Sequence, residues 1–445
     1  MEFDRKVVRA WCMYDWANSA YVTTTAAALF PVYFVQGIAP EGATVVGRWV
    51  PASALWGYGV GLAALLVLIL APVLGAMADY TCLKKRMLMI FALMGSVCAS
   101  LLYLATPGAV WYALGMFVLA QFCFVAGNVF YDAFLPQIVP EHLTDRISGL
   151  GYAYGYAGGG LQFALALVLV AQPHWFGVDQ TTAVRLAILM AGLWWGLFSL
   201  YTFRYLPEIC PEGQTARRLA LGKLVRVGFE RTWHTARQLP RFRPLMLFLI
   251  AFLFYNDGIQ TVISVASAYG GSELKLAPSV IMLTFLIVQM IAYGGARFFS
   301  WLAERTGTRE AIILALFCWT GVVTYGYFLQ VGDVKGFMGL GVLVGIVLGG
   351  SQALSRSLYA QMIPTEASAE FFGFFSVFNK LSAVMGPLLF GTLTAVWGSA
   401  RPAILSFIGF FVVGMVLLLF VDVKRGRAER QRWRFKGETV SFDEA

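Results

Sequence analysis

Charged residues are scarce in this chain of 445 residues. Asp, Glu, Lys and Arg together make up 13% of it, whereas hydrophobic residues make up 59%. An ordinary soluble domain has a charged share of about 25%, and a soluble fold of this size has no means of hiding so much apolar surface from water. The composition therefore excludes an ordinary soluble domain and predicts that lipid covers most of the protein.

Histidine and cysteine are also few. The three histidines, His142, His174 and His234, all lie in expected loops. No CxxC pair occurs among the cysteines, which are Cys12, Cys82, Cys98, Cys123, Cys210 and Cys318. We therefore expect no zinc site, no disulfide framework and no other cofactor, and an intramembrane enzyme is disfavoured. The sequence also lacks a phosphate-binding loop of the GxxxxGK[ST] type, so ATP is not expected to drive this protein.

Long apolar runs dominate what is present. A transmembrane helix needs about 20 predominantly apolar residues, and twelve runs meet this requirement. They span residues 11–35, 54–78, 86–106, 111–135, 147–171, 183–206, 244–268, 278–303, 309–330, 336–359, 370–396 and 402–422. The sequence thus predicts an all-α polytopic membrane protein of twelve transmembrane helices. The first run is too long for a signal-peptide core, so we expect it to be retained.

The predicted organisation has four parts. An N-terminal six-helix bundle covers residues 1–206, a basic linker 207–243, a C-terminal six-helix bundle 244–422 and a tail 423–445. With loops assigned alternately to the two sides, 25 Lys and Arg residues fall on one side and five on the other. This bias places both termini and the linker in the cytoplasm. The short loops and compact termini suggest the inner (plasma) membrane of a bacterium, and we expect a monomer.

The net charge of +9 does not indicate a nucleic-acid partner. The basic residues occur in short stretches between apolar runs and form no separate basic domain. In a membrane protein such clusters mark the cytoplasmic side. The expected partners are therefore the lipid bilayer and a small solute.

The two halves repeat each other. Three residues after the fourth run match three residues after the tenth run, each pair 224 positions apart: Gln137 with Gln361, Pro140 with Pro364, and Gly149 with Gly373. Parallel six-helix repeats with a substrate site between them at mid-depth are a transporter architecture. The repeat therefore predicts two related bundles around a central site.

A charged motif follows the second run and returns after the eighth. The first copy contains Gly75, Asp79, Lys84 and Lys85, and the second contains Ser300, Glu304, Arg305, Gly307 and Arg309. The first copy resembles the loop signature of the major facilitator superfamily, although Tyr80 and Cys82 replace a basic residue and a glycine. The resemblance covers residues 5–425 and implies the fold of that superfamily.

A narrower resemblance rests on three segments. Residues 14–21 (YDWANSAY), 355–357 (SRS) and 370–374 (EFFGF) resemble motifs of the UMF1 or Atg22-like subfamily. This resemblance implies efflux of a small solute, with amino acids the substrate class attached to the eukaryotic members. It does not identify the substrate of bacterial members.

The superfamily resemblance also implies a gate. Asp79 would latch the second helix to the eleventh when the site faces outward, and Glu304 would pair symmetrically with the fifth helix. Such contacts stabilise one of two states and do not bind substrate. The basic members of this gating group are Lys84, Lys85, Arg305 and Arg309. The alternative is a structural ion pair at a helix end.

Charges within the apolar runs usually face a cavity, because an unpaired charge in a bilayer costs several kcal/mol. Asp15 and Asp257 lie on the first helix of each half, with Asn18 one turn from Asp15. Asp257 is about thirteen residues into its run, or roughly 20 Å at helical rise. Either acid is a candidate for a cationic substrate group or a coupling proton. Alternatively Asp257 is a structural acceptor for its neighbours Tyr255, Asn256 and Gln260.

Asp132 and Arg356 occupy equivalent positions, again 224 residues apart. They can pair across the halves when the site is closed to the cytoplasm, grip a zwitterionic substrate, or form a plain structural pair. Lys380 in the eleventh run either binds an anion or extends to the membrane surface. Asn128 is a further substrate candidate, although amides in a bilayer more often join helices.

The resulting prediction is a secondary transporter that works by alternating access. Its halves rock around a site formed by helices one, four, seven and ten, and the solute is an amino acid or related metabolite, exported, with possible proton coupling through Asp257 or Asp15. A uniporter needs no coupling group. A lipid, amphiphile or drug translocase on the same fold is the alternative, and a non-transporting sensor is disfavoured.

Overall fold

The computed structural model describes residues 3–210 and 220–431. Within these ranges, twelve helical spans are long and apolar enough to cross a membrane, which confirms the predicted helix count. The first span, Arg5–Ile38, contains α1 (Arg5–Ala20), a π-helical segment (Tyr21–Leu29), α2 (Phe30–Tyr33) and a second π-helical segment (Phe34–Ile38). The other five spans of the first half contain α3 (Ala52–Thr81), α4 (Lys84–Leu101), α5 (Val110–Ile138), α6 (Thr144–Ala171) and α7 (Gln180–Tyr205).

The second half has the same number of spans. They contain α9 (Arg243–Ala268), α10 (Pro278–Thr306), α11 (Thr308–Phe328), α12 (Val334–Met362), α13 (Ser368–Leu381) with α14 (Met385–Trp397), and α15 (Ala400–Leu419). Two shorter helices, α8 (Leu221–Gln238) and α16 (Val423–Arg430), lie outside the spans. An antiparallel hairpin joins β1 (Ala43–Val45) to β2 (Arg48–Val50).

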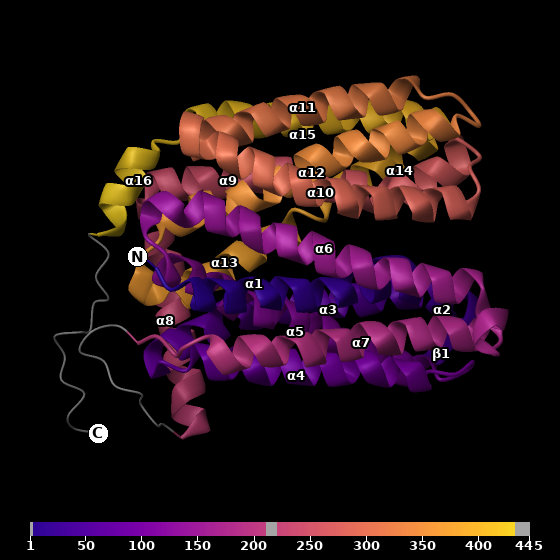
Figure 1. Ribbon diagram of the computed structural model, residues 1–445, viewed down its shortest axis with the longest axis horizontal. Helices are drawn as coiled ribbons and strands as arrows, with labels where there is room; N and C mark the ends of the chain where they lie inside the picture. Colours follow the sequence, from indigo (N-terminus) through magenta and orange to yellow (C-terminus); the bar gives the residue numbers. More distant parts are fainter. Residues whose placement is uncertain (1–2, 211–219, 432–445) are drawn as a thin grey trace.

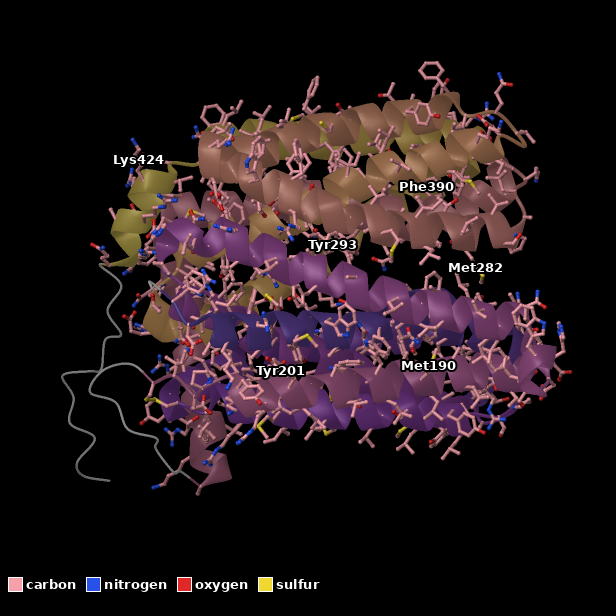
Figure 2. All side chains as sticks on the ribbon, viewed as in Figure 1. Met190, Tyr201, Met282, Tyr293, Phe390 and Lys424 are labelled. Atoms are coloured by element: carbon pink, nitrogen blue, oxygen red, sulfur yellow. A yellow bond between two sulfur atoms is a disulfide. The ribbon has the colours of Figure 1, made fainter. Side chains whose placement is uncertain are left out.

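The two halves lie side by side along the length of the molecule (Figure 1). They meet mainly where α6 packs against α10 and where α3 packs against α13. Residue 3, α8 and α16 lie at one end of the molecule, which we call the termini end, and the β-hairpin lies at the opposite, hairpin end (Figure 1). Apolar side chains cover the outer surface, as expected for a surface that faces lipid (Figure 2).

Side chains and backbone turns at the loops define where helices begin and end. Asp4, Asp179 and Asp422 each accept hydrogen bonds from backbone N–H groups in the first turn of α1, α7 and α16, which satisfies donors that the helix itself leaves open. The C-terminal end of α3 is marked by Cys82, the residue after its last residue, whose φ of 54° is left-handed. These local signals explain why the observed helices extend several residues beyond some of the predicted apolar runs.

The eleventh span is broken between α13 and α14. Asn256 on α9 donates to Ser382 Oγ at 2.5 Å, and the backbone N–H of Gly386 donates to Asp257 Oδ1 at 2.9 Å. The first N–H groups of a helix have no acceptor within it, so Asp257 satisfies that of Gly386, and the next residue, Pro387, has no N–H to satisfy. The break, between Leu381 and Met385, lies just before the Gly386–Pro387 pair.

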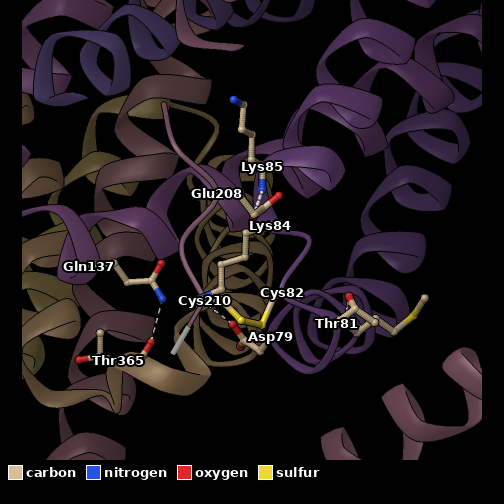
Figure 3. Close-up of a disulfide and its surroundings, with 10 residues drawn as sticks. Asp79, Thr81, Cys82, Lys84, Lys85, Gln137, Glu208, Cys210 and Thr365 are labelled. Carbon is tan, nitrogen blue, oxygen red and sulfur yellow. Dashed lines mark hydrogen bonds and ion pairs between the residues drawn. A yellow bond between two sulfur atoms is a disulfide. The ribbon is translucent and has the colours of Figure 1, made fainter. Parts of the chain in front are cut away.

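A disulfide joins Cys82, after α3, to Cys210, after α7, with 5.2 Å between their Cα atoms (Figure 3). The expectation that the cysteines form no disulfide was wrong. The two residues are 128 positions apart, and only packing of α4 beside α7 brings their loops together. Beside the disulfide, Glu208 accepts hydrogen bonds from the backbone N–H of Lys85 at 2.8 Å and from that of Arg86. The start of the linker is therefore fastened to the first half.

Candidate functional site: a central cavity and its closed end

A cavity of about 800 Å³ lies between the two halves. Both halves line it, chiefly the first, fourth and fifth spans of one and the seventh, eighth and tenth spans of the other. The lining extends from Arg356 at its floor to Trp56 and Phe337 towards the hairpin end. The contacts described below close the molecule between this floor and the termini end.

Arg356 on α12 is the centre of a charge cluster at the floor of the cavity. Its Nη1 lies 3.0 Å from Asp132 Oδ1 on α5 and 3.3 Å from Asp15 Oδ2 on α1. Its Nε donates to Ser148 Oγ at 3.0 Å, and Nη2 donates to the Ser148 carbonyl at 2.9 Å. Tyr131 donates its hydroxyl to Asp15 at 2.7 Å. The predicted pairing of Asp132 with Arg356 across the halves is confirmed, and Asp15 joins it.

Aromatic rings surround the same guanidinium. Its carbon lies 4.2 Å from the ring centroid of Tyr152 and 4.9 Å from that of Trp11, and Trp11 donates its Nε1–H to the Tyr131 carbonyl at 2.8 Å. Guanidinium groups pack well against such ring faces. Sequence reasoning missed Tyr131, Tyr152 and Ser148. The five donors of a buried arginine require acceptors beyond two carboxylates, but a sequence does not show which residues supply them.

Of the candidates on α9, Gln260 lines the cavity, whereas Tyr255, Asn256 and Asp257 are not part of the described lining. Asp257 and Asn256 instead hold the break in the eleventh span. The Tyr255 hydroxyl shares a hydrogen bond of 2.7 Å with Ser355 on α12. In this conformation the three side chains therefore contact neighbouring helices of their own half.

The cavity wall carries one cation and several amides. Lys380, on α13, lines the cavity, and no carboxylate of the described residues lies within ion-pair distance of it. Asn18 donates to Asn128 Oδ1 at 2.7 Å, and both also line the cavity. Asn18 is nearly fully buried, so this pair joins the first and fourth spans while presenting polar edges to the cavity.

The expected contact between the second and eleventh helices is present at the termini end. Asp79 accepts hydrogen bonds from the backbone N–H of Glu370 at 2.8 Å and of Ala369 at 3.4 Å. Lys84 pairs with Asp79 at 2.8 Å and donates to Ser368 Oγ at 3.0 Å. Asp79 and Lys84 lie next to the disulfide (Figure 3). A carboxylate thus binds the open N–H groups at the start of α13, where a negative charge is favoured.

The second half does not repeat this contact. Glu304 is exposed and forms no hydrogen bond or ion pair within the described residues. Instead Thr308 donates its hydroxyl to Asp145 at the start of α6, at 2.7 Å. Ser357 and Gln361 of the second half also donate to Asp145. The expected pairing of Glu304 with the fifth helix is therefore not formed in this conformation, in which the start of α6 bonds to Thr308, Ser357 and Gln361.

The basic residues that follow Glu304 contact their own half. The Arg305 guanidinium lies over the ring of Trp301, 4.1 Å from its centroid. Arg309 donates to the Val421 carbonyl at 3.0 Å. In this conformation neither side chain crosses to the first half.

The helix after the last span bridges both halves at the termini end. Arg427 on α16 pairs with Glu141 of the first half at 2.9 Å, and Arg430 pairs with the same carboxylate. Arg430 also donates to the carbonyl of Gln361 in the second half at 2.8 Å. Sequence reasoning treated residues 423–445 as a tail and missed this bridge; residues 432–445 lie outside the described part of the chain.

Two six-helix halves around a central cavity that is closed at one end define a transporter with the major facilitator fold. Solved structures share this fold. The human organic anion transporter MFSD10 (TETRAN) matches with a TM-score of 0.68 at 16% identity, over 93% of this chain and 99% of that chain. FucP, crystallised in the outward conformation, matches with a TM-score of 0.63 at 12% identity, over 93% and 98%.

The chain belongs to the family described as "Vacuole effluxer Atg22 like", which matches residues 3–431. Among its relatives, the uncharacterized MFS-type transporter YxiO of Bacillus subtilis is 32% identical over 94% of this chain and 95% of its own. Autophagy-related protein 22-1 of Aspergillus niger is 22% identical over 96% of this chain and 89% of its own. The chain is therefore an integral membrane protein and an MFS-type transporter.

Proposed function

We propose that this protein exports a small zwitterionic solute, an amino acid or related metabolite, by alternating access. The observation that carries the proposal is the charge pattern of the cavity. At the floor, two carboxylates share one guanidinium, which leaves an excess negative charge. On the wall, Lys380 supplies a positive charge without a described ion-pair partner. A solute with an ammonium and a carboxylate complements both.

The size of the cavity supports a small solute. Its volume of about 800 Å³ falls within the range of roughly 300–1,000 Å³ of small-molecule sites. A charged floor fits a zwitterion better than a lipid tail, because an apolar tail offers no polar group to Arg356, Asp15 and Asp132. Transport of a lipid or amphiphile is therefore the alternative outcome of the transport assay.

The same floor supports proton coupling. The Arg356 guanidinium compensates one of its two carboxylates, Asp15 and Asp132, so the other can take up either a proton or the substrate ammonium. Competition of this kind between two cations is a simple basis for antiport. Asp15 lines the cavity, which favours it over Asp257 as the coupling group.

The orientation follows from the basic residues. With both termini in the cytoplasm of a bacterial plasma membrane, the present conformation is closed towards the cytoplasm and its cavity lies on the outer side. Export would then begin from the opposite conformation, in which the termini end opens. The structure would represent the state after solute release.

Transport into proteoliposomes tests the function. Purified protein is given a labelled amino-acid panel with and without an imposed pH gradient, and uptake is compared with protein-free vesicles. We expect gradient-stimulated accumulation of at least one amino acid. If no amino acid accumulates while a fluorescent lipid or amphiphile does, the zwitterion proposal is refuted and the lipid alternative takes its place.

A matched pair of lysine variants tests the site. Lys380→Met should raise KM roughly 10- to 100-fold, because it removes a charge-assisted contact worth about 1.5–3 kcal/mol. Lys335→Met, at an exposed position near the hairpin end, should leave KM unchanged. Equal behaviour of the two variants would rule out Lys380 as the carboxylate contact.

A further inference from the structure

The helix α8 runs across the ends of the transmembrane helices, whereas the twelve spans run along the molecule (Figure 1). It lies in the segment that the sequence indicated only as a basic linker. Residues 221–243 contain six Lys or Arg residues and a single Glu. The question is why this part of the linker is helical and what its free surface contacts.

One face of α8 packs against α3. Leu224 is buried in a cluster with Val73 and Met77. Gly228 allows a close approach, because a Cβ atom there would lie 2.7 Å from Met77 Cγ. Val73 and Met77 lie eight and four residues before the end of α3 at Thr81, which corresponds to depths of roughly 12 and 6 Å at helical rise. Measured from the end of α3, these levels match the roughly 5–10 Å at which interfacial helices enter a membrane surface.

The opposite face of α8 is apolar along one arc. Val225, Phe229 and Trp233 follow each other at a spacing of four residues and are 37%, 47% and 61% exposed. Residues at this spacing form a single stripe along a helix. These side chains stay partly exposed in the described structure, and on α3 Ile69, one turn before Val73, is 50% exposed.

Basic residues border this stripe. Arg226 and Arg237 lie beside Trp233 on the helical circumference, and the Arg237 guanidinium lies 4.7 Å from the centroid of the Trp233 ring. Arg226 pairs with Glu230 at 2.8 Å, whereas Arg237 and Lys223 form no ion pair within the described residues. An apolar arc next to an arc of cations is the pattern of a helix that lies in a membrane interface.

We propose that α8 is an interfacial helix that binds anionic phospholipid headgroups of the leaflet at the termini end. Phe229 and Trp233 enter the boundary between headgroups and acyl chains, and Arg226, Arg237 and Lys223 bind the lipid phosphates. Lipid is the occupant that the geometry favours, since α8 packs near the end of the membrane-spanning α3, one turn from its exposed Ile69, and its cations border an apolar stripe. A soluble protein partner would have to displace lipid from the stripe and from the neighbouring surface of α3.

The helix is also joined to the closed end of the transporter. On its inner side Arg231 lies 3.6 Å from Glu370 and 5.8 Å from the ring centroid of Tyr80. The backbone N–H of Glu370 is one of the two groups that Asp79 binds. Lipid that holds α8 in place therefore also supports the contact between α3 and α13.

A depth measurement tests the placement. Spin labels are attached singly at positions 233 and 223 of the full chain, in a background that has Ala at the half-buried Cys318, and the protein is reconstituted with phosphatidylglycerol. The label at 233 should be more accessible to oxygen than to a water-soluble nickel complex, and the label at 223 should show the reverse. Equal exposure of both labels to the nickel complex would overturn the proposal and leave the stripe free for a soluble partner.

A lipid titration tests the headgroup preference. Thermal unfolding of the purified protein in detergent is followed with increasing phosphatidylglycerol, phosphatidylcholine or soluble glycerol phosphate. Only phosphatidylglycerol should raise the midpoint, and Arg226→Gln with Arg237→Gln should raise the lipid concentration for half the effect on the order of tenfold. The control, Arg48→Gln with Lys335→Gln near the hairpin end, should behave as the parent protein. An equal rise of the midpoint with phosphatidylcholine would contradict the proposal. So would an equal increase, in the control, of the lipid concentration for half the effect.

Discussion

Replacing Arg356 by Gln should open the termini end. The side chain is 3% exposed and its guanidinium joins α12 of the second half to Asp15 and Asp132 of the first half. Without it, two carboxylates face each other at the floor of the closed cavity with no cation between them. Removing one partner of a buried ion pair costs about 3–5 kcal/mol. We use the lower value, because the two carboxylates are 14% and 18% exposed.

This cost falls on one conformation. When the termini end opens, the halves separate there and water reaches both carboxylates, so the substitution costs little free energy in the open state. A difference of about 3 kcal/mol shifts the equilibrium between the two states roughly 100-fold towards the open one.

Distances between spin labels on the two halves measure the shift. One pair of labels is placed at exposed positions 146 and 306 at the termini end, and another at Trp175 and Val331 at the hairpin end. In Arg356→Gln the first distance should increase and the second should decrease. Adding Asp15→Asn and Asp132→Asn should restore part of the parent distribution, since it removes the repulsion. An unchanged distribution in the single variant, in folded protein, would refute the role of the cluster in closing this end.

Three further predictions use the same distances or thermal unfolding. In Gly75→Val the new Cβ would lie 2.1 Å from the Ala369 carbonyl oxygen. Such overpacking costs about 1–3 kcal/mol and should shift the equilibrium towards the conformation open at the termini end on the order of tenfold. An unchanged distance distribution would mean that the helices yield without separating. Glu141→Gln removes the pair with Arg427 and, because that pair is partly exposed, should shift the equilibrium only about two- to fivefold; a larger shift would contradict this screening argument. Asp257→Ala should lower the free energy of unfolding by about 1–2 kcal/mol, because it removes the cap of α14. Asp257→Asn keeps an acceptor and should therefore keep both stability and proton coupling. Loss of coupling in the Asn variant, with stability unchanged, would identify Asp257 as the proton-coupling group.

Part of the site could be predicted because it depends on the repeat. Asp132 and Arg356 stand at equivalent positions of two related halves, so the offset indicated a pairing across the halves as one of three alternatives, and the structure shows that pair. The contact of Asp79 with the start of α13 was implied by the resemblance of its motif to that of the major facilitator superfamily. Glu304 shows the limit of this reasoning. Its symmetric contact is absent in this conformation, and Asp145 at the start of α6 accepts from Thr308, Ser357 and Gln361 instead.

Other parts depended on which side of a helix faces the cavity. Asp257 was expected at the site because of its depth in the seventh span. Depth indicates the level of a residue along the helix, but not whether its side chain points towards the cavity. The broken eleventh span takes the carboxylate as its cap, and this break depends on Pro387 together with Asn256 on another helix. No single run of the sequence contains both requirements.

The sequence by itself determined the membrane environment, the twelve helices and the two halves, because hydrophobic length and the distribution of charges act locally and the bilayer imposes one orientation on each run. Tertiary structure alone decided the disulfide of Cys82 with Cys210, the bridge of α16 between the halves, the placement of α8 and the acceptors of Arg356. Each of these depends on contacts between residues far apart in the chain, and their geometry exists only once the helices have packed.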